Sequence, residues 1–267
     1  PSLIDFPVNI QTSENEFKMG IVKHKKVDSW YLEAGIEELE YMLSVSKRPL
    51  ILLGHGVRLS DSAEKAKKLI NKFDIPFVVS WGGFDLIEHS HKRFIGDIGV
   101  YGKRGANFAV QNCELDTRQT GGDLKMFARD AKKVMVDIDS NELFKNQNRG
   151  LSIDLPIRCD AGLFIDGVLN NIKEVPDQQY NWIEKCKKWK NWVEEREIRE
   201  DNILTSYEVV DKISTLVKPA DVIIPDEGGH LVWCMQKFKI DNQRIFSNFG
   251  NSSMGYALPS AIGAAIG

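Results

Sequence analysis

Short apolar runs alternate with helical patterns along most of this chain, and each run ends at glycines or polar residues. Residues 48–53 lead into Gly54-His55-Gly56, and residues 77–79 lead into Trp81-Gly82-Gly83. The pattern recurs at residues 133–138, 151–158 and 221–225. Apolar runs without polar alternation are typical of parallel strands covered on both faces. Strands that alternate with helices predict an α/β fold on a crossover-connected parallel sheet, Rossmann-like in its middle part.

Amphipathic helices are expected between these strands. Four apolar residues open the middle unit at helical spacing: Leu32, Ile36, Leu39 and Leu43. A helix capped by Asp61 is expected to end near Phe73. Further helices are expected at residues 107–113, 162–172, 178–200 and 206–217. The long charged helix at 178–200 has one apolar face, formed by Trp182, Cys186, Trp189 and Val193. We expect this face to pack against a neighbouring element rather than to contact a cofactor.

Composition excludes several classes of function. The net charge is −3, with 35 basic and 38 acidic side chains well mixed, so no nucleic-acid partner is expected. No apolar run approaches the thickness of a bilayer. The four cysteines lie far apart, with neither zinc spacing nor a disulfide framework. We therefore expect a soluble cytoplasmic protein with reduced thiols and no membrane partner.

The segment from Gly250 to Gly267 combines features that favour phosphate binding. A turn dense in glycine and serine runs into Leu258-Pro259 and then into a helix of alanine, isoleucine and glycine. Proline fits the first turn of a helix, and the free N–H groups and positive dipole end at a helix start favour a phosphate. The alternative is an ordinary junction between a loop and a core helix.

A second motif lies upstream. Asp226-Glu227-Gly228-Gly229-His230 ends the apolar run at 221–225, and Trp233 follows on the next expected helix. Ligands of open α/β sheets collect at the carboxyl ends of strands. A histidine in this place either contacts a ligand or is a hydrogen-bonded structural residue.

Together the two motifs resemble thiamine diphosphate (ThDP) enzymes of the acetolactate synthase (large subunit) type. The resemblance is carried by Ser253-Met254-Gly255, Leu258-Pro259 and residues 261–264, with Asp226, Gly228, His230 and Trp233 upstream. It implies ThDP and Mg²⁺ as cofactors, with Met254 propping the two rings of ThDP; the alternative for Met254 is a core-filling side chain. The family usually has glutamine in the place of Gly229 and glycine in the place of Ser252. The resemblance assigns ThDP contacts to Glu227, Gly228, Gly229, His230, Ser252 and Met254.

The middle unit has ligand candidates of its own at the ends of its strands. A nucleotide lying across a parallel sheet needs small residues for close backbone approach and often an acidic side chain for a ribose hydroxyl. Lys103, Arg104 and Arg118 could hold a pyrophosphate. The unit is similar to the central domain of the acetolactate synthase group, which carries a mostly structural FAD there; another adenine nucleotide such as ADP, or no ligand, stays open. The resemblance assigns FAD contacts to Gly54, His55, Gly56, Ser80, Trp81, Gly82, Gly99, Val100, Tyr101, Asp116, Arg118, Asp137 and Ile138.

The resemblance also implies a division of the chain. Residues 1–14 would be the tail of an N-terminal pyrimidine-binding domain, 15–31 a linker and 32–172 the central FAD or nucleotide-binding domain. Residues 173–203 would be a helical linker, and 204–267 the start of the ThDP diphosphate-binding domain.

Three features of the resembled family are not expected within residues 1–267. They are the glutamate of the N-terminal domain, the Asp-Asn motif for Mg²⁺ that should begin soon after Gly267, and an apolar strand after the helix at 107–113. Cys113 is followed at once by Glu114-Leu115-Asp116, so a central strand is missing and unpaired sheet edges are expected. We therefore expect neither a catalytic residue nor a metal ligand within residues 1–267.

The resemblance implies a ThDP-dependent carboligase that decarboxylates pyruvate and ligates the two-carbon unit to a second 2-keto acid. The expected assembly is a homodimer or homotetramer. Two alternatives stay open. One is transfer of the two-carbon unit to a nucleotide-activated keto sugar, and the other is a non-catalytic nucleotide-binding module.

Overall fold

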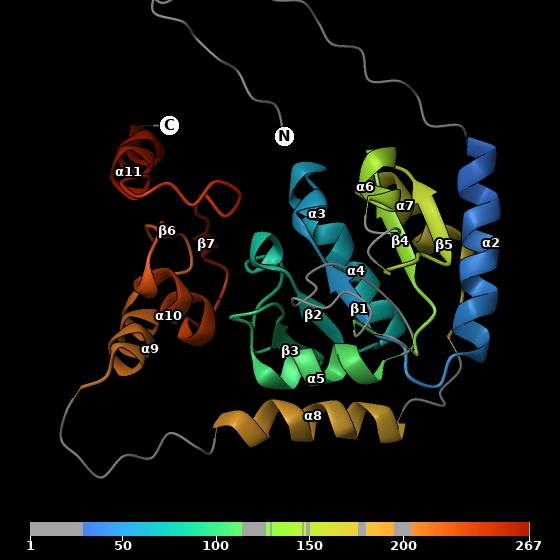
Figure 1. Cartoon of the computed structure of the whole chain (residues 1–267), viewed down its shortest axis with the longest axis horizontal. Coiled ribbons are helices and arrows are strands. Elements are labelled where there is room, and N and C mark those ends of the chain that lie inside the picture. Colours follow the sequence, from blue (N-terminus) through green and yellow to red (C-terminus); the bar gives the residue numbers. More distant parts are fainter. Residues whose placement is uncertain are drawn as a thin grey trace, which may run out of the picture.

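The computed structural model describes residues 29–113, 127–128, 130–145, 147, 150–175, 180–194 and 204–266. The predictions for residues 1–28, Asp116 and Arg118 lie outside these ranges. We call the described residues from 29 to 194 the central unit, and those from 204 to 266 the carboxyl-terminal unit. Figure 1 shows the central unit around its strands and the carboxyl-terminal unit beside it.

Parallel strands form the middle of the central unit, as the apolar runs predict. The strands β1 (Ile51–Leu53), β2 (Phe77–Val79) and β3 (Phe94–Asp97) form one sheet in the order β1-β2-β3. The strands β4 (Val134–Asp137) and β5 (Leu155–Arg158) form a separate parallel pair. The sequence did not predict β3, because Phe94–Asp97 contains a glycine and an aspartate in place of a continuous apolar run.

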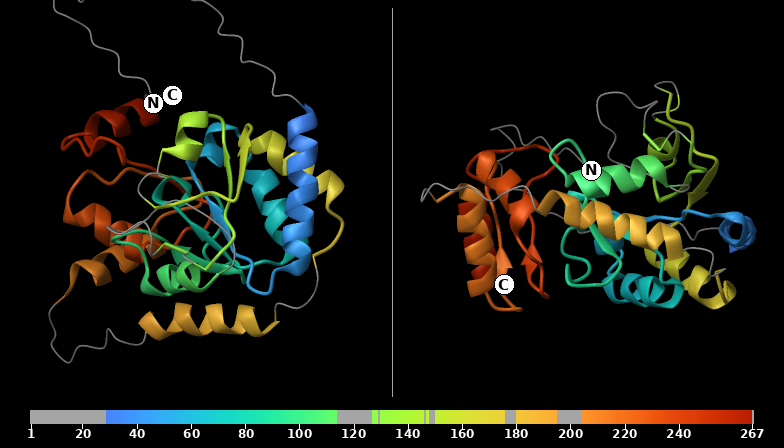
Figure 2. Two further views of the ribbon diagram at one scale, coloured as in Figure 1. Left: turned by 45° about the vertical axis from the view of Figure 1, so that its right-hand side comes forward. Right: turned by 90° about the horizontal axis from the view of Figure 1, so that it is seen from below.

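Helices cover these strands on both sides (Figures 1 and 2). α2 (Ser29–Val45) packs on β5 and on α7 (Ala161–Asn171), and α4 (Ala63–Phe73) also packs on α7. The short helix α3 (His55–Leu59), the 3₁₀ turn η1 (Trp81–Gly83) and α6 (Ser140–Phe144) follow β1, β2 and β4. None of the helices in the described ranges is long and apolar enough to span a membrane.

The predicted cap of the helix that ends at Phe73 is wrong. The helix α4 begins at Ala63, its N-cap residue is Ser62, and Asp61 lies outside it with a left-handed φ of 49°. The cause is the additional helix α3, which starts directly after Gly54 and leaves Asp61 in the tight turn between α3 and α4.

The prediction that the tryptophan face of the long helix packs against a neighbour is confirmed. This helix is α8 (Tyr180–Glu194), and it packs along α5 (Arg104–Asn112). Trp182 and Cys186 are buried, and the indole nitrogen of Trp182 donates to the carbonyl of Pro49 at 2.8 Å. A side chain at Gly105 would lie only 2.5 Å from the backbone of Trp189, so this glycine allows the two helices to approach.

The carboxyl-terminal unit is a small α/β layer. Its parallel strands β6 (Val222–Ile223) and β7 (Arg244–Ile245) are flanked by α9 (Ser206–Leu216), α10 (Gly229–Lys237) and α11 (Ala257–Ile266). A capping box of Thr205 and Glu208 begins α9. The helix α11 confirms the predicted helix with Pro259 in its first turn.

Apolar packing and backbone hydrogen bonds join the two units. Met235, Phe238 and Ile245 belong to the same buried cluster as Phe84 of the central unit. The amide of His89 donates to the carbonyl of Ile240 at 3.0 Å, so the loop after β2 is fixed against the carboxyl-terminal unit.

The break expected in the central sheet is found between β1 and β4. Hydrogen bonds join β1 to β2 and β4 to β5, and the described residues place no strand between the two groups. The facing edges line an apolar cavity of about 450 Å³, which side chains of α2, α4 and α7 also enclose. Strand edges that have no partner among the described residues, next to an apolar cavity, cost stability.

We expect an apolar strand inserted directly after Cys113 to stabilise the central unit. Four buried apolar side chains contribute about 1.5–3 kcal/mol each, and ordering the inserted backbone costs about 1–2 kcal/mol per residue. Over six inserted residues these two contributions nearly cancel, so the expected gain comes from the backbone hydrogen bonds that pair the two strand edges, about 0.5–1.5 kcal/mol each. Urea denaturation of a Leu-Leu-Val-Ile-Gly-Ser insertion measures it, with a Ser/Gly insertion of equal length as control. Equal stability of the two insertions would contradict the expectation.

Candidate functional site

The first two predicted turns of the central unit lie against each other at the carboxyl ends of β1 and β2. The ring nitrogen Nδ1 of His55 bonds the carbonyl of Gly82 at 3.1 Å. A side chain at Gly82 would meet Cβ of His55 at 2.7 Å, so only glycine allows this approach. A side chain at Gly54 or Gly56 would make only ordinary van der Waals contacts, because its Cβ would meet no atom closer than 3.9 Å.

Trp81 connects these turns to the third strand. Its indole nitrogen donates to Oδ2 of Asp97 at 3.1 Å, and its ring stacks on Tyr101 with 6.2 Å between centroids. The loop that carries Gly99, Val100 and Tyr101 is closed by Asn107, whose amide side chain bonds both the N–H and the carbonyl of Gly99. The predicted residues at the ends of β2 and β3 are therefore brought together.

The structure places the predicted acidic residue on the far side of the sheet break. Asp137 ends β4 and lines the same cavity as Gly54, His55, Gly56 and Ser80. Its Oδ1 accepts from the amide of Asp139 at 2.9 Å, and Ile138 beside it is exposed.

Asp97 is a buried carboxylate that the sequence analysis missed. Its Oδ1 has no hydrogen-bond partner among the described residues, and the residue is fully buried. Burial raises the pKa of Asp97 to about 6, against the opposing effect of the Lys103 ammonium. A single aspartate at the end of a strand gives no sequence signal for this state.

The two motifs assigned to ThDP meet at the carboxyl ends of β6 and β7. The carboxylate of Asp226 accepts from the amide of Gly255 at 3.0 Å and from that of Ala257 at 3.4 Å. The expectation of free N–H groups at this helix start is therefore wrong for these two amides, because Asp226 caps α11. Hydrogen bonds from backbone amides, first that of Glu227, lower the pKa of Asp226.

Both glycines before His230 lie under aromatic rings. A side chain at Gly228 would be 3.0 Å from the His230 ring, and one at Gly229 would be 3.1 Å from the Trp233 ring. Gly228 also has a φ of 144°, a backbone conformation that favours glycine. A side chain at position 229 would require the Trp233 ring to move by a few tenths of an ångström. His230 is exposed, and Oε1 of Glu227 is buried with no partner among the described residues.

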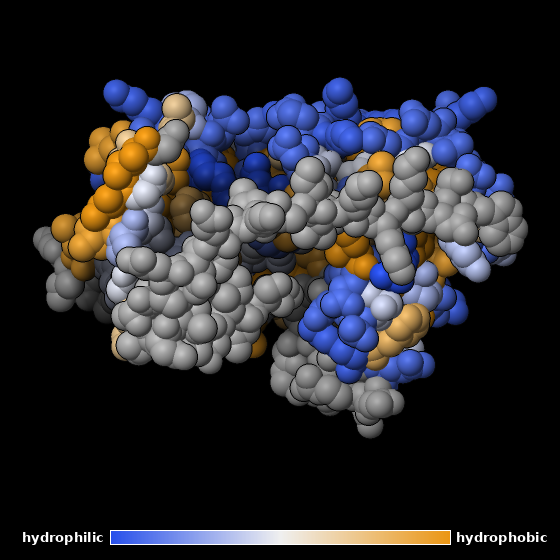
Figure 3. All heavy atoms as spheres, turned by 90° about the horizontal axis from the view of Figure 1, so that it is seen from above, coloured by the Kyte–Doolittle hydropathy of each residue, from blue (hydrophilic) through white to orange (hydrophobic). Residues whose placement is uncertain are grey.

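The glycine-serine segment leaves its apolar side chains uncovered. Met254 is 87% exposed, and Leu258, Ile262 and Ile266 of α11 are also exposed. Figure 3 shows the apolar strip over α11 at the left of the view. Ser252 has a left-handed φ of 51°, in the position where the resembled family usually has glycine.

Comparison with known proteins identifies a family for the middle of the chain. Residues 36–168 match the family model described as "thiamine pyrophosphate enzyme, central domain". By this match, residues 36–168 form a central domain of the thiamine pyrophosphate enzyme family. Thiamine pyrophosphate is another name for ThDP.

The chain is similar to curated acetolactate synthase large subunits. That of Cyanidium caldarium is 29% identical, over 99% of this chain and 48% of the relative. The probable subunit of Methanococcus aeolicus is 30% identical over 84% of this chain and 41% of the relative. Isozyme 2 of Escherichia coli K12 is 25% identical over the whole chain and 48% of the relative. The chain thus spans about half the length of these relatives.

The alignments also contain gaps in this chain. Those with the Cyanidium caldarium and Escherichia coli subunits run over 284 and 279 positions, whereas this chain has 267 residues. The relatives therefore have positions with no counterpart here. As for metals, no group of three or more metal-binding side chains occurs within the described ranges.

We expect Asp97→Asn to stabilise the protein at neutral pH and to have little effect near pH 4. Because the folded state keeps the Asp97 proton up to about pH 6, wild-type stability falls as the pH rises from about 4 to 6 and then stays lower. The asparagine variant lacks this loss, on the order of 3 kcal/mol at pH 7. Urea denaturation from pH 4 to 8 measures it, with exposed Asp241→Asn as control. A gain that is equal at both ends of this range would contradict the expectation.

We expect Ser252→Gly to stabilise the segment before α11. A left-handed conformation costs a non-glycine residue about 1–2 kcal/mol, and glycine loses about 0.5–1 kcal/mol more backbone entropy on folding. The expected gain is therefore roughly 0.5–1 kcal/mol in the free energy of unfolding. Ser253→Gly is the matched control, because Ser253 has no positive φ and accepts a bond from Asn248. If the two serine variants responded alike to denaturant, the strain at Ser252 would be refuted.

Proposed function

We propose that this chain is part of a ThDP-dependent carboligase of the acetolactate synthase type. The reaction is decarboxylation of pyruvate and ligation of its two-carbon unit to a second 2-keto acid. One observation carries the proposal: Asp226 ties the Gly228–His230 turn to the Met254 segment at the carboxyl edge of β6 and β7. This edge is where ligands of α/β sheets bind.

The residues around Asp226 fit ThDP. Gly250 and Gly255 face open space, since an added Cβ would meet no atom within 4 Å. His230 and Met254 are exposed and free to contact a ligand. When bound, ThDP supplies the carbanion stabilisation that decarboxylation needs, and the protein supplies binding and orientation. The residues proposed to hold ThDP are Glu227, Gly228, Gly229, His230, Ser252 and Met254. Mg²⁺ would bridge the diphosphate to ligands elsewhere in the whole protein.

We propose FAD as the ligand of the central unit. Gly54 and Gly56 after β1, the tryptophan-tyrosine stack and Asp137 lie at the carboxyl ends of the strands. These are the small and acidic groups that a nucleotide needs. The flavin would have a structural role, because the proposed net reaction is not a redox reaction. A protein that stays colourless, and whose stability ignores added FAD, would refute this assignment.

We also propose that the whole protein is a cytoplasmic homodimer or homotetramer. The support is the apolar surface of α11, where Leu258 is 71% and Ile266 is 82% exposed. Apolar surface of this kind favours burial against another protein surface.

The test uses the whole protein, ThDP, Mg²⁺ and ¹³C-labelled pyruvate. We expect labelled CO₂ and a new carbon–carbon product with a second 2-keto acid, identified by mass spectrometry. His230→Ala is expected to weaken ThDP binding by about 10–100-fold, the value of a charge-assisted hydrogen bond. His91→Ala, a histidine of the central unit that bonds Asn71, is the matched control. Absence of both products with every 2-keto acid tested would refute the proposed function.

A further inference from the structure

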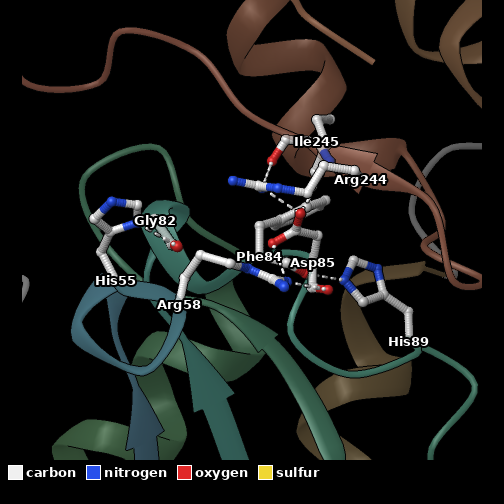
Figure 4. A network of polar contacts seen from close by, with 8 residues as sticks. All are labelled: His55, Arg58, Gly82, Phe84, Asp85, His89, Arg244 and Ile245. Atoms are coloured by element: carbon white, nitrogen blue, oxygen red, sulfur yellow. Dashed lines mark hydrogen bonds and ion pairs between the residues drawn. The ribbon is translucent and has the colours of Figure 1, made fainter. Parts of the chain in front are cut away.

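A buried aspartate lies where the two units meet. Asp85 follows η1 in the central unit, and its side chain is 1% exposed. Figure 4 shows Arg58 on one side of its carboxylate and Arg244 with Ile245 on the other. Oδ1 accepts from Nη2 of Arg58 at 3.0 Å. Oδ2 accepts from Nη1 of Arg244 and, at 3.0 Å, from the amide of Ile245.

The Arg58 side leads to the proposed FAD turn. Arg58 belongs to α3, the helix that begins directly after Gly54. Its Nη2 also donates to the backbone carbonyl of Asp85 at 3.0 Å, so it is fixed to both the main chain and the side chain of that residue. His55, three positions earlier, bonds Gly82 of the same loop. A shift of the Gly54–Gly56 turn would therefore move the partners of Asp85.

The Arg244 side leads to the proposed ThDP segment. Arg244 and Ile245 form β7, and the guanidinium of Arg244 lies 5.1 Å from the centre of the Phe246 ring. The chain after β7 is braced, because Ser247 donates to the carbonyl of Pro225 at 2.7 Å and Asn248 donates to Ser253 at 3.1 Å. A shift of β7 would therefore move Ser253 and its neighbour Met254.

Charge makes this three-residue contact sensitive. One buried carboxylate faces two guanidinium groups from different units. Without its charge, the two guanidiniums would keep their desolvation cost and repel each other. His89 nearby does not change this balance with pH, since burial lowers its pKa to about 3 and its neutral ring donates through Nε2 to the carbonyl of Phe84.

We propose that Asp85 is a positioning residue that couples the two cofactor sites. It fixes the proposed ThDP segment, through Arg244 and β7, at the place set by the proposed FAD turn through Arg58. The inference rests on the proposed function, which supplies the two ligands. Because coupling between two binding sites is reciprocal, FAD tightens ThDP binding and ThDP tightens FAD binding by the same factor.

The test is calorimetric titration of the whole protein with ThDP and Mg²⁺, with and without saturating FAD. In the wild type we expect FAD to lower the Kd of ThDP by at least about fivefold, the lower range of measured couplings. In Asp85→Asn, the ratio of the Kd of ThDP without FAD to the Kd with FAD falls to near one. If the asparagine variant does not fold, Arg58→Lys in the central unit and Arg244→Lys in the carboxyl-terminal unit replace it. Each keeps the positive charge but changes the hydrogen bonds to Asp85, so each is expected to lower the ratio.

Asp74→Asn is the matched control. Asp74 pairs with Arg93 at 3.0 Å and with Lys92, all within the central unit, so its loss leaves the ratio at the wild-type value. A ratio that is unchanged in the Asp85 and arginine variants, or is one in the wild type, overturns the coupling while leaving the proposed function intact. Failure of the wild type to bind ThDP refutes the proposed function and the coupling with it.

Discussion

The central unit depends on the close packing of the turn after β2 against the end of β1. The amide of Ser80 donates to the carbonyl of Leu53 at 3.0 Å, and a side chain at Gly83 would lie only 2.5 Å from that carbonyl oxygen. This approach allows His55 to reach Gly82 and directs Trp81 toward Asp97. The same turn continues into Phe84 and Asp85, so it also sets the contact between the units. Gly83 thus positions both the proposed ligand-binding edge and the contact between the two units.

A second carboxylate has the corresponding role in the carboxyl-terminal unit. The carboxylate of Asp226 accepts hydrogen bonds from backbone amides at the start of α11. Its negative charge neutralises part of the positive end of the helix dipole. A ThDP diphosphate at this edge would then depend more on His230 and on the backbone near Gly228 than on the α11 dipole. Gly228 and Gly229 lie against the rings of His230 and Trp233. The shape of this edge therefore depends both on the two rings and on glycine at these two positions.

The sequence predicted the parts of the fold that rest on periodicity. The apolar runs before Gly54 and Trp81 are β1 and β2, and the tryptophan face of α8 is buried as its spacing indicated. What was missed depends on contacts between distant residues. The strand β3 has only two apolar residues, and its place is set by pairing with β2. Asp85 and Asp97 stand alone in the sequence, and only the packing around each carboxylate gives it a role.

The sheet break and the proposed FAD site lie in the same place, between β1 and β4. Ligands of doubly wound sheets bind where the strand order reverses. Here β1 and β4 are the edges on either side of the break, and Gly54, Ser80 and Asp137 are among the residues that line the cavity between them. A nucleotide at this place would have glycine backbone on one side and Asp137 on the other, with the unpaired edges beneath it. The spacing between β1 and β4 therefore sets the distance between the two walls of the proposed site, so strand pairing controls the geometry of that site as well as the stability of the core.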